Sequence, residues 1–300
     1  MEIASAEIQE IRVLGARERI AAFVELTKPR IAFMLVLTSA AGFYIGTKGN
    51  FDFALFANAM IGIALLAFGV ATLNQYIERR TDALMERTAG RPLPTGKISP
   101  MEALVFGVLQ CAVAELYLYA LVNPLTAVLG LAVIIGYVFL YTPLKTRTST
   151  STAIGAIPGA MPPLMGWTAA ANEITIGAWA LFVLLFLWQF PHFLAIAWMY
   201  REQYAKAGIL MLPVVEPEGK ITARQIVMFT IMLVAISLAP FFLGFAGLIY
   251  LVGASILGIW FLMESIQTAR AKSVEKARRL LMVSVLYLPL IFGLLVLDNR

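Results

Sequence analysis

Three oxygen-bearing side chains recur at four-residue intervals where a long apolar segment ends. They are the first, middle and last residues of Asn74-Gln-Tyr-Ile-Glu78-Arg-Arg-Thr-Asp82. In a helix, residues four apart rise about 6 Å and drift only about 40° around the axis, so all three share one face. Mg²⁺ accepts carboxylate and amide oxygens, keeps several waters and binds substrate phosphates. The spacing therefore predicts a catalytic magnesium–diphosphate site, with Glu78 and Asp82 as metal ligands.

Basic residues follow this acidic run at once. Arg87 and Arg91 lie in Arg87-Thr-Ala-Gly-Arg91-Pro-Leu, and a guanidinium group can hold phosphate oxygens through two parallel hydrogen bonds. Lys145 and Arg147 end a later apolar segment, where they either clamp a diphosphate or only mark a helix end. We expect all four to bind diphosphate. The alternative for the acidic run is a solvated helix end, but carboxylates near a membrane are costly and tend to be functional.

The only histidine of the chain lies in a second cluster. Trp188-Gln-Phe-Pro-His192-Phe is followed by Arg201-Glu202-Gln-Tyr204. His192 could transfer a proton or ligate the iron of a metalloporphyrin, although a lone histidine on an apolar face is often a core residue. Glu202 is the candidate for a further catalytic, metal-binding carboxylate.

The elements that must position these residues are membrane-spanning helices. Hydrophobic residues make up 60% of the 300-residue chain, charged residues 14%, and the mean hydropathy is +0.83. A soluble domain cannot bury so much apolar surface. The net charge of +5 is not gathered into a nucleic-acid-binding patch, so we expect a lipid bilayer and no nucleic acid as the chain's surroundings.

Nine apolar segments are long enough to cross a bilayer core, which needs roughly 20 residues of helix. They are residues 31–47, 54–75, 101–121, 124–143, 153–171, 177–199, 225–245, 247–265 and 279–298. Pro158, Pro162 and Pro163 interrupt the fifth, and such breaks are tolerated where backbone faces protein rather than lipid.

The distribution of basic residues gives this arrangement an inside and an outside. Twenty-one of the 23 Lys and Arg residues fall in the N-terminal segment and in the loops after the second, fourth, sixth and eighth segments. Only Lys48 and Arg300 fall on the other side. Since cytoplasmic loops collect basic residues, we expect the N-terminus and all these loops in the cytoplasm, with the protein in the cell membrane.

The N-terminal residues 1–30 differ from the rest of the chain. They mix charged and apolar residues, with no apolar stretch before a small-residue cleavage site, and predict an amphipathic cytoplasmic segment rather than a cleavable signal. Thr27-Lys28-Pro-Arg30 closes this segment as an interfacial anchor or a binding element. Residues 31–300 are predicted to form a single polytopic membrane domain, with Cys111 as a small core residue.

These motifs resemble the UbiA superfamily of intramembrane prenyltransferases and, within it, the protoheme IX farnesyltransferase family. The acidic run, continued through Arg87-Thr-Ala-Gly-Arg91-Pro-Leu, carries the superfamily resemblance, together with Tyr141-Thr-Pro-Leu-Lys145. Thr27-Lys-Pro-Arg30 and Pro162-Pro-Leu-Met-Gly166-Trp167 add to the resemblance. The haem branch is indicated by Trp188-Gln-Phe-Pro-His192-Phe and Ala207-Gly-Ile-Leu-Met211-Leu-Pro213. The similarity runs in order through nearly the whole chain.

The resemblance implies an all-α bundle of nine transmembrane helices around a central cavity. It implies Mg²⁺-dependent transfer of the farnesyl group of farnesyl diphosphate to a vinyl group of haem b. With addition of water, the products are haem O and diphosphate, and a haem A synthase or a terminal oxidase assembly is the expected partner. The residues assigned to haem binding are Lys28, Arg30, His192 and Tyr204.

Two positions depart from the pattern of the resembling proteins. Many relatives have Asp where this chain has Gln203, which weakens a second metal site and leaves Glu202 as its candidate. Relatives often have proline where this chain has Leu210.

The same diphosphate site would also suit prenylation of a quinone precursor or a lipid alcohol. A transporter is the third alternative, but it predicts ionisable residues at mid-bilayer, where Glu115 is the exception.

Overall fold

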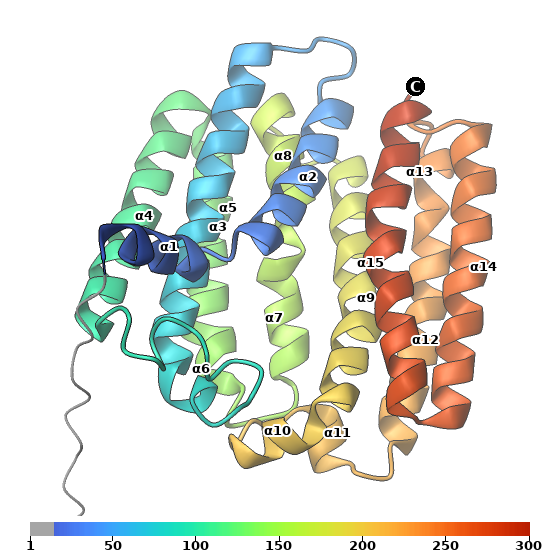
Figure 1. Cartoon of the computed structure of the whole chain (residues 1–300). Coiled ribbons are helices and arrows are strands. Elements are labelled where there is room, and N and C mark those ends of the chain that lie inside the picture. Colours follow the sequence, from blue (N-terminus) through green and yellow to red (C-terminus); the bar gives the residue numbers. More distant parts are fainter. Residues whose placement is uncertain (1–14) are drawn as a thin grey trace, which may run out of the picture.

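The computed structural model describes residues 15–300, which form an all-α helical bundle (Figure 1). Within this range the only β-type pairing is an isolated bridge between Ala246 and Asn299. The predicted all-α fold is confirmed. Residues 1–14, part of the predicted N-terminal segment, lie outside the described residues.

Eight helical stretches of the described chain are long and apolar enough to cross a membrane. Two are composite: α5 (Pro124–Ile134) runs into a π-helix η1 (Ile135–Tyr141) and α6 (Thr142–Leu144), and α12 (Lys220–Ser237) into α13 (Ala239–Phe242). The others are α2 (Pro29–Gly46), α3 (Phe53–Asp82), α4 (Pro100–Leu121), α9 (Ile176–Met199), α14 (Leu248–Ala271) and α15 (Val274–Leu297).

The predicted span at 153–171 consists of two short helices, α7 (Ser151–Gly159) and α8 (Met161–Ala171), which meet at Ala160. Pro162 and Pro163 have no N–H to donate, so the helical ladder cannot continue through them. The side chains from Pro162 to Ala169 are buried in the bundle, where the broken backbone avoids lipid. The structure thus adds one interrupted pair to eight continuous stretches, and the count of nine spans and the central cavity stay predictions.

The charged loops gather at one end of the bundle. This end carries α6, the short helices α10 (Arg201–Lys206) and α11 (Leu212–Val215), and the turn between α14 and α15 (Figure 1). The C-terminus lies at the opposite end. The helix α1 (Ala16–Leu26) crosses α3 and α4 rather than running along them, and packs Ala22 and Leu26 against Ile98 and Ala103.

Close contact between α2 and α8 depends on glycine. A Cβ on Gly166 would lie 1.9 Å from the Ser39 carbonyl oxygen, and a Cβ on Gly42 would lie 2.1 Å from the Pro163 oxygen. Both neighbours are backbone atoms, which cannot turn aside as a flexible side chain could. Small residues let membrane helices approach to this distance.

We predict that Gly166→Ala destabilises the protein by about 2–3 kcal/mol, because two helix backbones must separate. Thermal unfolding of the purified protein in detergent measures this loss. Gly293→Ala is the matched control, since a Cβ there meets nothing within 4 Å. Equal melting temperatures for the two variants would show that the α2–α8 contact does not depend on Gly166.

Candidate active site

The acidic face of α3 is the base of the candidate site. The helix runs unbroken for 30 residues through Asp82, so Asn74, Glu78 and Asp82 share one face as predicted. Asn74 and Asp82 are only 2% and 1% exposed, and Glu78 is half-buried. Buried carboxylates require compensating charges or hydrogen bonds.

Each of these three side chains binds a cation from a different part of the chain. Lys145 Nζ lies 2.5 Å from Glu78 Oε1, and Arg91 donates to Asp82 Oδ2 at 2.6 Å. Lys28, in the turn between α1 and α2, donates to Asn74 Oδ1 at 2.9 Å. Three cations and two carboxylates meet here, so the cluster carries net positive charge when Lys28 is protonated, which suits an anionic substrate.

The cations are themselves held in place. Lys28 has a left-handed backbone (φ 49°), a conformation that non-glycine residues adopt rarely and often at functional sites. Burial, and then the nearby Arg91 guanidinium, lower the pKa of Lys28 to about 7. Burial also acts to lower the pKa of Lys145, but the Glu78 carboxylate outweighs it and the pKa is raised well above its usual value.

The π-helix η1 brings further polar groups to the cluster. The Thr142 hydroxyl donates to the Tyr137 carbonyl at 2.8 Å and accepts from Asn74 Nδ2 at 3.1 Å. The Tyr141 ring lies under the Lys145 ammonium, 4.4 Å from its centroid. Short π segments are frequent at functional sites. We did not assign Tyr137, Tyr141 or Thr142 to the site from sequence, although the last two stand beside Lys145 in a motif.

The loop after α3 is closed onto Asp82. Thr88 is buried, and its hydroxyl donates to the Asp82 carbonyl at 2.8 Å, which folds the chain back so that Arg91 reaches the Asp82 carboxylate. Thr88 is a further residue of the site that the sequence motifs alone did not indicate. The position of Thr88 between Arg87 and Arg91 is the sequence feature that could have indicated its role.

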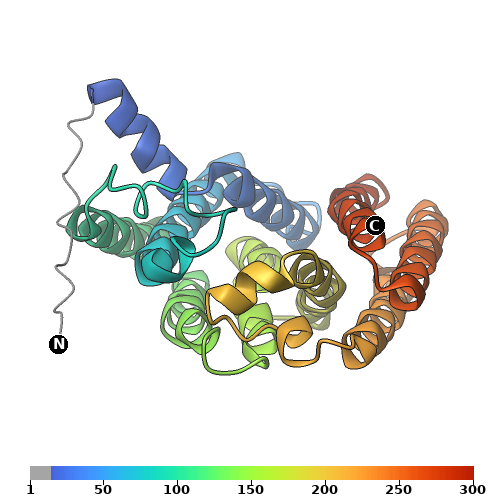
Figure 2. The ribbon, with the colours of Figure 1, turned by 60° about the horizontal axis from the view of Figure 1, so that its bottom comes forward.

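The helix α10 lies across this end of the bundle, in front of the surrounding helices in Figure 2. Gln203 Oε1 accepts from the Arg87 backbone N–H at 3.3 Å, and the Tyr204 hydroxyl accepts from the Arg87 guanidinium at 3.3 Å. The side-chain amide of Gln203 thus accepts a hydrogen bond from the backbone of the loop that carries Arg87. Tyr204, predicted at the haem site, instead holds a residue predicted to bind diphosphate.

A second link joins the α10 region to Lys145. The Leu210 N–H donates to the Lys145 carbonyl at 2.8 Å, a bond that a proline at this position could not make. Beneath it, Met85 packs with Ile209 and Met211 in a small buried cluster. The methionines of two separate motifs therefore serve to join two loops of the site.

Four predicted site residues are not brought into this cluster, and His192 is one of them. The other three, Arg30, Arg147 and Glu202, are exposed, and among the residues that the structure describes their side chains form no ion pair with the α3 face. Their assignments to substrate or metal stay predictions.

His192 lies on the face of α9 that meets α15. Its Nδ1 is 2.8 Å from Ser284 Oγ, its ring stacks on Trp188 at 4.5 Å, and Trp188 Nε1 donates to the Ser284 carbonyl at 2.9 Å. The Ser284 hydroxyl already donates its proton to the Leu281 carbonyl at 2.7 Å, so it must accept from His192. The imidazole therefore carries its proton on Nδ1 and keeps a lone pair on Nε2.

A metal at the α3 face would not be held by protein alone. No group of three or more His, Cys, Asp or Glu side chains able to hold a metal occurs within residues 15–300. The donor set of Glu78, Asp82 and Asn74 is hard oxygen, which fits Mg²⁺, an ion that takes one or two carboxylates together with substrate phosphates and water. The arrangement can thus bind a diphosphate through cations and through a shared metal.

Known proteins are similar to this chain in sequence or in fold. The UbiA prenyltransferase family matches residues 35–288. Protoheme IX farnesyltransferase of Solibacter usitatus is 48% identical over 286 residues, covering 92% of this chain and 98% of the relative. Protoheme IX farnesyltransferase of Salinibacter ruber is 46% identical over 276 residues, with the same coverage of both chains.

Solved structures share the fold at low sequence identity. A digeranylgeranylglyceryl phosphate synthase aligns with a TM-score of 0.79 at 16% identity, over 94% of this chain and 98% of that one. A UbiA homologue from Archaeoglobus fulgidus, bound to GPP and Mg²⁺, aligns with a TM-score of 0.67 at 20% identity, over 91% and 99%. The family match covers most of the chain, and the relatives match over nearly their full length. The chain therefore belongs to the UbiA prenyltransferase family, together with its protoheme IX farnesyltransferase relatives.

Proposed function

We propose that this protein transfers the farnesyl group of farnesyl diphosphate to a vinyl group of haem b. The observation that carries the proposal is the α3 face, where a row of oxygen ligands is matched by three cations, in a chain 48% identical to a protoheme IX farnesyltransferase. The products are haem O and diphosphate. Water adds to the vinyl carbon that does not bond to the farnesyl group, and one proton is released.

The reaction begins with cleavage of the bond between the first farnesyl carbon and the diphosphate oxygen. Negative charge then grows on the diphosphate, and preformed cations aimed at it lower the barrier. Lys145 and Arg91 are in position to give that stabilisation, with Arg87 at the edge of the site. In the free protein they neutralise Glu78 and Asp82 instead.

Mg²⁺ is the proposed cofactor, held by Glu78 and Asp82. When bound, it neutralises phosphate charge and orients the leaving group. Solved structures of an Archaeoglobus fulgidus UbiA homologue carry Mg²⁺ with GPP and with DMAPP, which supports the same metal here. With the carboxylates engaged by metal, Lys145 and Arg91 become available to phosphate oxygens. Glu202 stays a candidate for a second metal position.

His192 is proposed to act on the haem. Its free Nε2 lone pair can ligate haem iron or accept a proton, and the hydrogen bond to Ser284 fixes the ring for either role. Arg30 and Tyr204 are retained as haem-binding candidates. Lys28 lies against Asn74 among the diphosphate-binding groups, so its contact with the substrate is better assigned to the diphosphate.

The proposed setting is the cell membrane, with the site facing the cytoplasm. The clustering of basic loops at the end that holds the α3 face supports this orientation. A haem A synthase or a terminal oxidase assembly is the proposed recipient of the product.

The purified protein, given farnesyl diphosphate, Mg²⁺ and haem b, is predicted to form haem O, detected by mass spectrometry. A parallel reaction with a quinone precursor such as 4-hydroxybenzoate is predicted to give no product. Prenylation of the quinone precursor without farnesylated haem would overturn the haem assignment and leave the diphosphate site intact.

Asp82→Asn is predicted to lower turnover roughly a hundredfold or more, because one metal-binding charge is lost while the side-chain shape is kept. Initial rates of haem O formation at saturating Mg²⁺ measure the change. Glu86→Gln is the matched control, since Glu86 is an exposed carboxylate nearby. An equal effect at both positions would argue against a specific role for Asp82.

Lys28 is predicted to give diphosphate binding a pH dependence. Below its pKa of about 7 the ammonium attracts the anion, and above it the lysine of the empty site is neutral. The affinity advantage of the wild type over Lys28→Met is therefore full below pH 7 and declines by up to about tenfold per pH unit above it. Calorimetric titration with inorganic diphosphate and Mg²⁺ tests this. Parallel pH profiles for the two proteins would refute it.

A further inference from the structure

A second cavity lies at the end of the bundle opposite the α3 face. Its volume is about 560 Å³, and it is formed where α2 and α15 end and α9 begins. Trp167 of α8 contributes to its wall. Because these are the far ends of membrane-crossing helices, the cavity lies at the other membrane surface, and nothing in the diphosphate chemistry uses it.

Unpaired polar atoms are concentrated in the residues that line this cavity. Among residues 15–300, seven buried side-chain nitrogen or oxygen atoms have no hydrogen-bond partner, and three of them belong to residues that line it. They are Trp167 Nε1, Thr175 Oγ1 and Asn299 Oδ1. Buried tryptophan N–H groups usually find a partner, so an unpaired donor on a residue only 4% exposed points to a ligand.

The indole of Trp167 is held in place by the neighbouring helices. A Cβ on Gly177 would lie 2.6 Å from the ring, and one on Gly46 would lie 3.3 Å from it. The edge of the Trp167 ring also meets Phe245, at 6.1 Å between centroids. The ring is therefore held in one orientation, and its N–H has no partner among the described residues.

The other groups of this cavity favour a negative charge. The N-cap residue of α9, Thr175, makes no side-chain capping bond, and Ile176 and Gly177 of its first turn line the cavity. The N-terminus of a 24-residue helix with unbound N–H groups attracts anions. Lys48 adds a cation, although it also lies 3.1 Å from Glu173 outside the cavity. The lining contains no Asp or Glu side chain.

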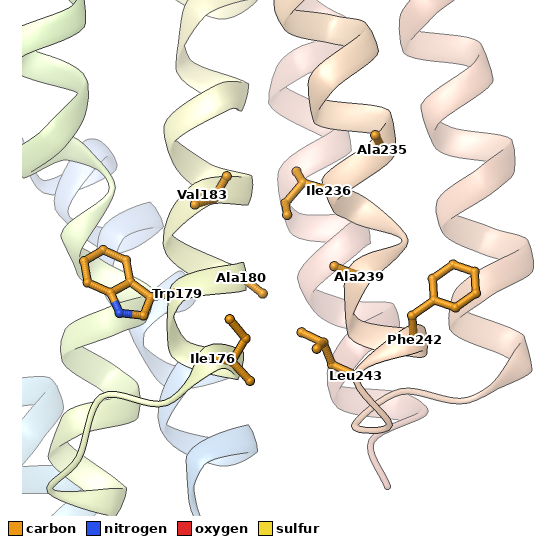
Figure 3. Close-up of a pocket in the computed structure, with 9 residues that line it drawn as sticks. All are labelled: Ile176, Trp179, Ala180, Val183, Ala235, Ile236, Ala239, Phe242 and Leu243. Atoms are coloured by element: carbon orange, nitrogen blue, oxygen red, sulfur yellow. The ribbon is translucent and has the colours of Figure 1, made fainter.

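An apolar groove adjoins the polar cavity. It has a volume of about 440 Å³ and lies between α9 and the α12–α13 stretch (Figure 3). Every residue that lines it is apolar, and Ile176 and Leu243 line both spaces. Its rim is open to the bilayer, since Ile176 is 69% and Phe242 74% exposed. An anion-binding cavity thus continues into a groove that fits an aliphatic chain.

We propose that these two spaces form a binding site for an anionic phospholipid of the leaflet opposite the active site. The phosphate lies against Trp167 Nε1, the first turn of α9 and Lys48. One acyl chain fills the groove between Ala180 and Ala239. A glycerol hydroxyl of the headgroup can donate to Asn299 Oδ1. The bilayer supplies this amphiphile at high local concentration, and the groove opens toward it.

Native mass spectrometry of the full-length protein, with phosphatidylglycerol and phosphatidylcholine of identical chains, tests the proposal. We expect the wild type to retain phosphatidylglycerol preferentially. Trp167→Phe, which removes the N–H together with part of the ring system, and Lys48→Gln should each weaken phosphatidylglycerol binding about tenfold, as for one hydrogen bond to a charged group. Ala239→Phe, which fills the groove, should weaken the binding of both lipids.

Matched controls are Trp260→Phe and Lys97→Gln, which line neither space and should bind both lipids like the wild type. Lys48 is exposed, so its variant tests the site even if Trp167→Phe fails to fold. Unchanged phosphatidylglycerol binding in the Lys48 and Ala239 variants would overturn the proposal. The proposal would also be overturned if Trp167→Phe lost haem b binding and kept lipid binding. In that case the anion held by this cavity would be a haem carboxylate. Binding of inorganic diphosphate with Mg²⁺ should be unchanged in all of these variants, which separates this test from that of the proposed function.

Discussion

The pairing of the α3 face with cations from three separate segments is the interaction on which the rest of this structure depends. Carboxylates at the end of a membrane helix are costly to bury unless opposite charges reach them. Lys28, Arg91 and Lys145 come from the turn before α2, the loop after α3 and the end of α6. Their convergence on one helix therefore requires that three loops pack together at one end of the bundle.

Several irregular features can be understood as ways to meet that requirement. The π-helix η1 turns Thr142 toward Asn74 and leaves Tyr141 under Lys145. The left-handed backbone at Lys28 lets α2 start with only Thr27 and Lys28 between it and α1. Leu210 donates its N–H to the Lys145 carbonyl and so connects the α10 region to the same cluster. Each of these features departs from regular helix geometry, and each acts on a group of the cluster at the α3 face.

The two ends of the bundle differ in whether their polar groups have protein partners. At the α3 end, the cations already have protein partners, and in the proposed function they exchange these partners for a substrate and its metal. At the other end, donors around Trp167 have no protein partner in the described chain. The first arrangement suits turnover, because bound and free states differ by a change of partners. The second suits a resident ligand, because the donors gain partners only when it binds.

The sequence by itself determined the membrane class, the positions of the apolar stretches and the shared face of Asn74, Glu78 and Asp82. These follow from local rules: helix periodicity, the length needed to cross a bilayer, and the placement of basic residues. It also pointed to Arg91 and Lys145 as neighbours of that face. The prolines of 153–171 indicated an interruption, although the division into α7 and α8 at Ala160 appeared only in the structure.

Only the tertiary structure decided which cation binds which oxygen, that Lys28 belongs with Asn74, and that Gln203 and Tyr204 hold Arg87. It likewise assigned Ser284 to His192, which fixed the imidazole tautomer, and placed Trp167 in the wall of a cavity at the opposite end of the bundle. Except for Arg91 and Asp82, which are nine positions apart, these pairs join residues that lie between 46 and 117 positions apart in the chain. Contacts of that kind depend on how whole helices pack, and no local pattern of residue types carries that information.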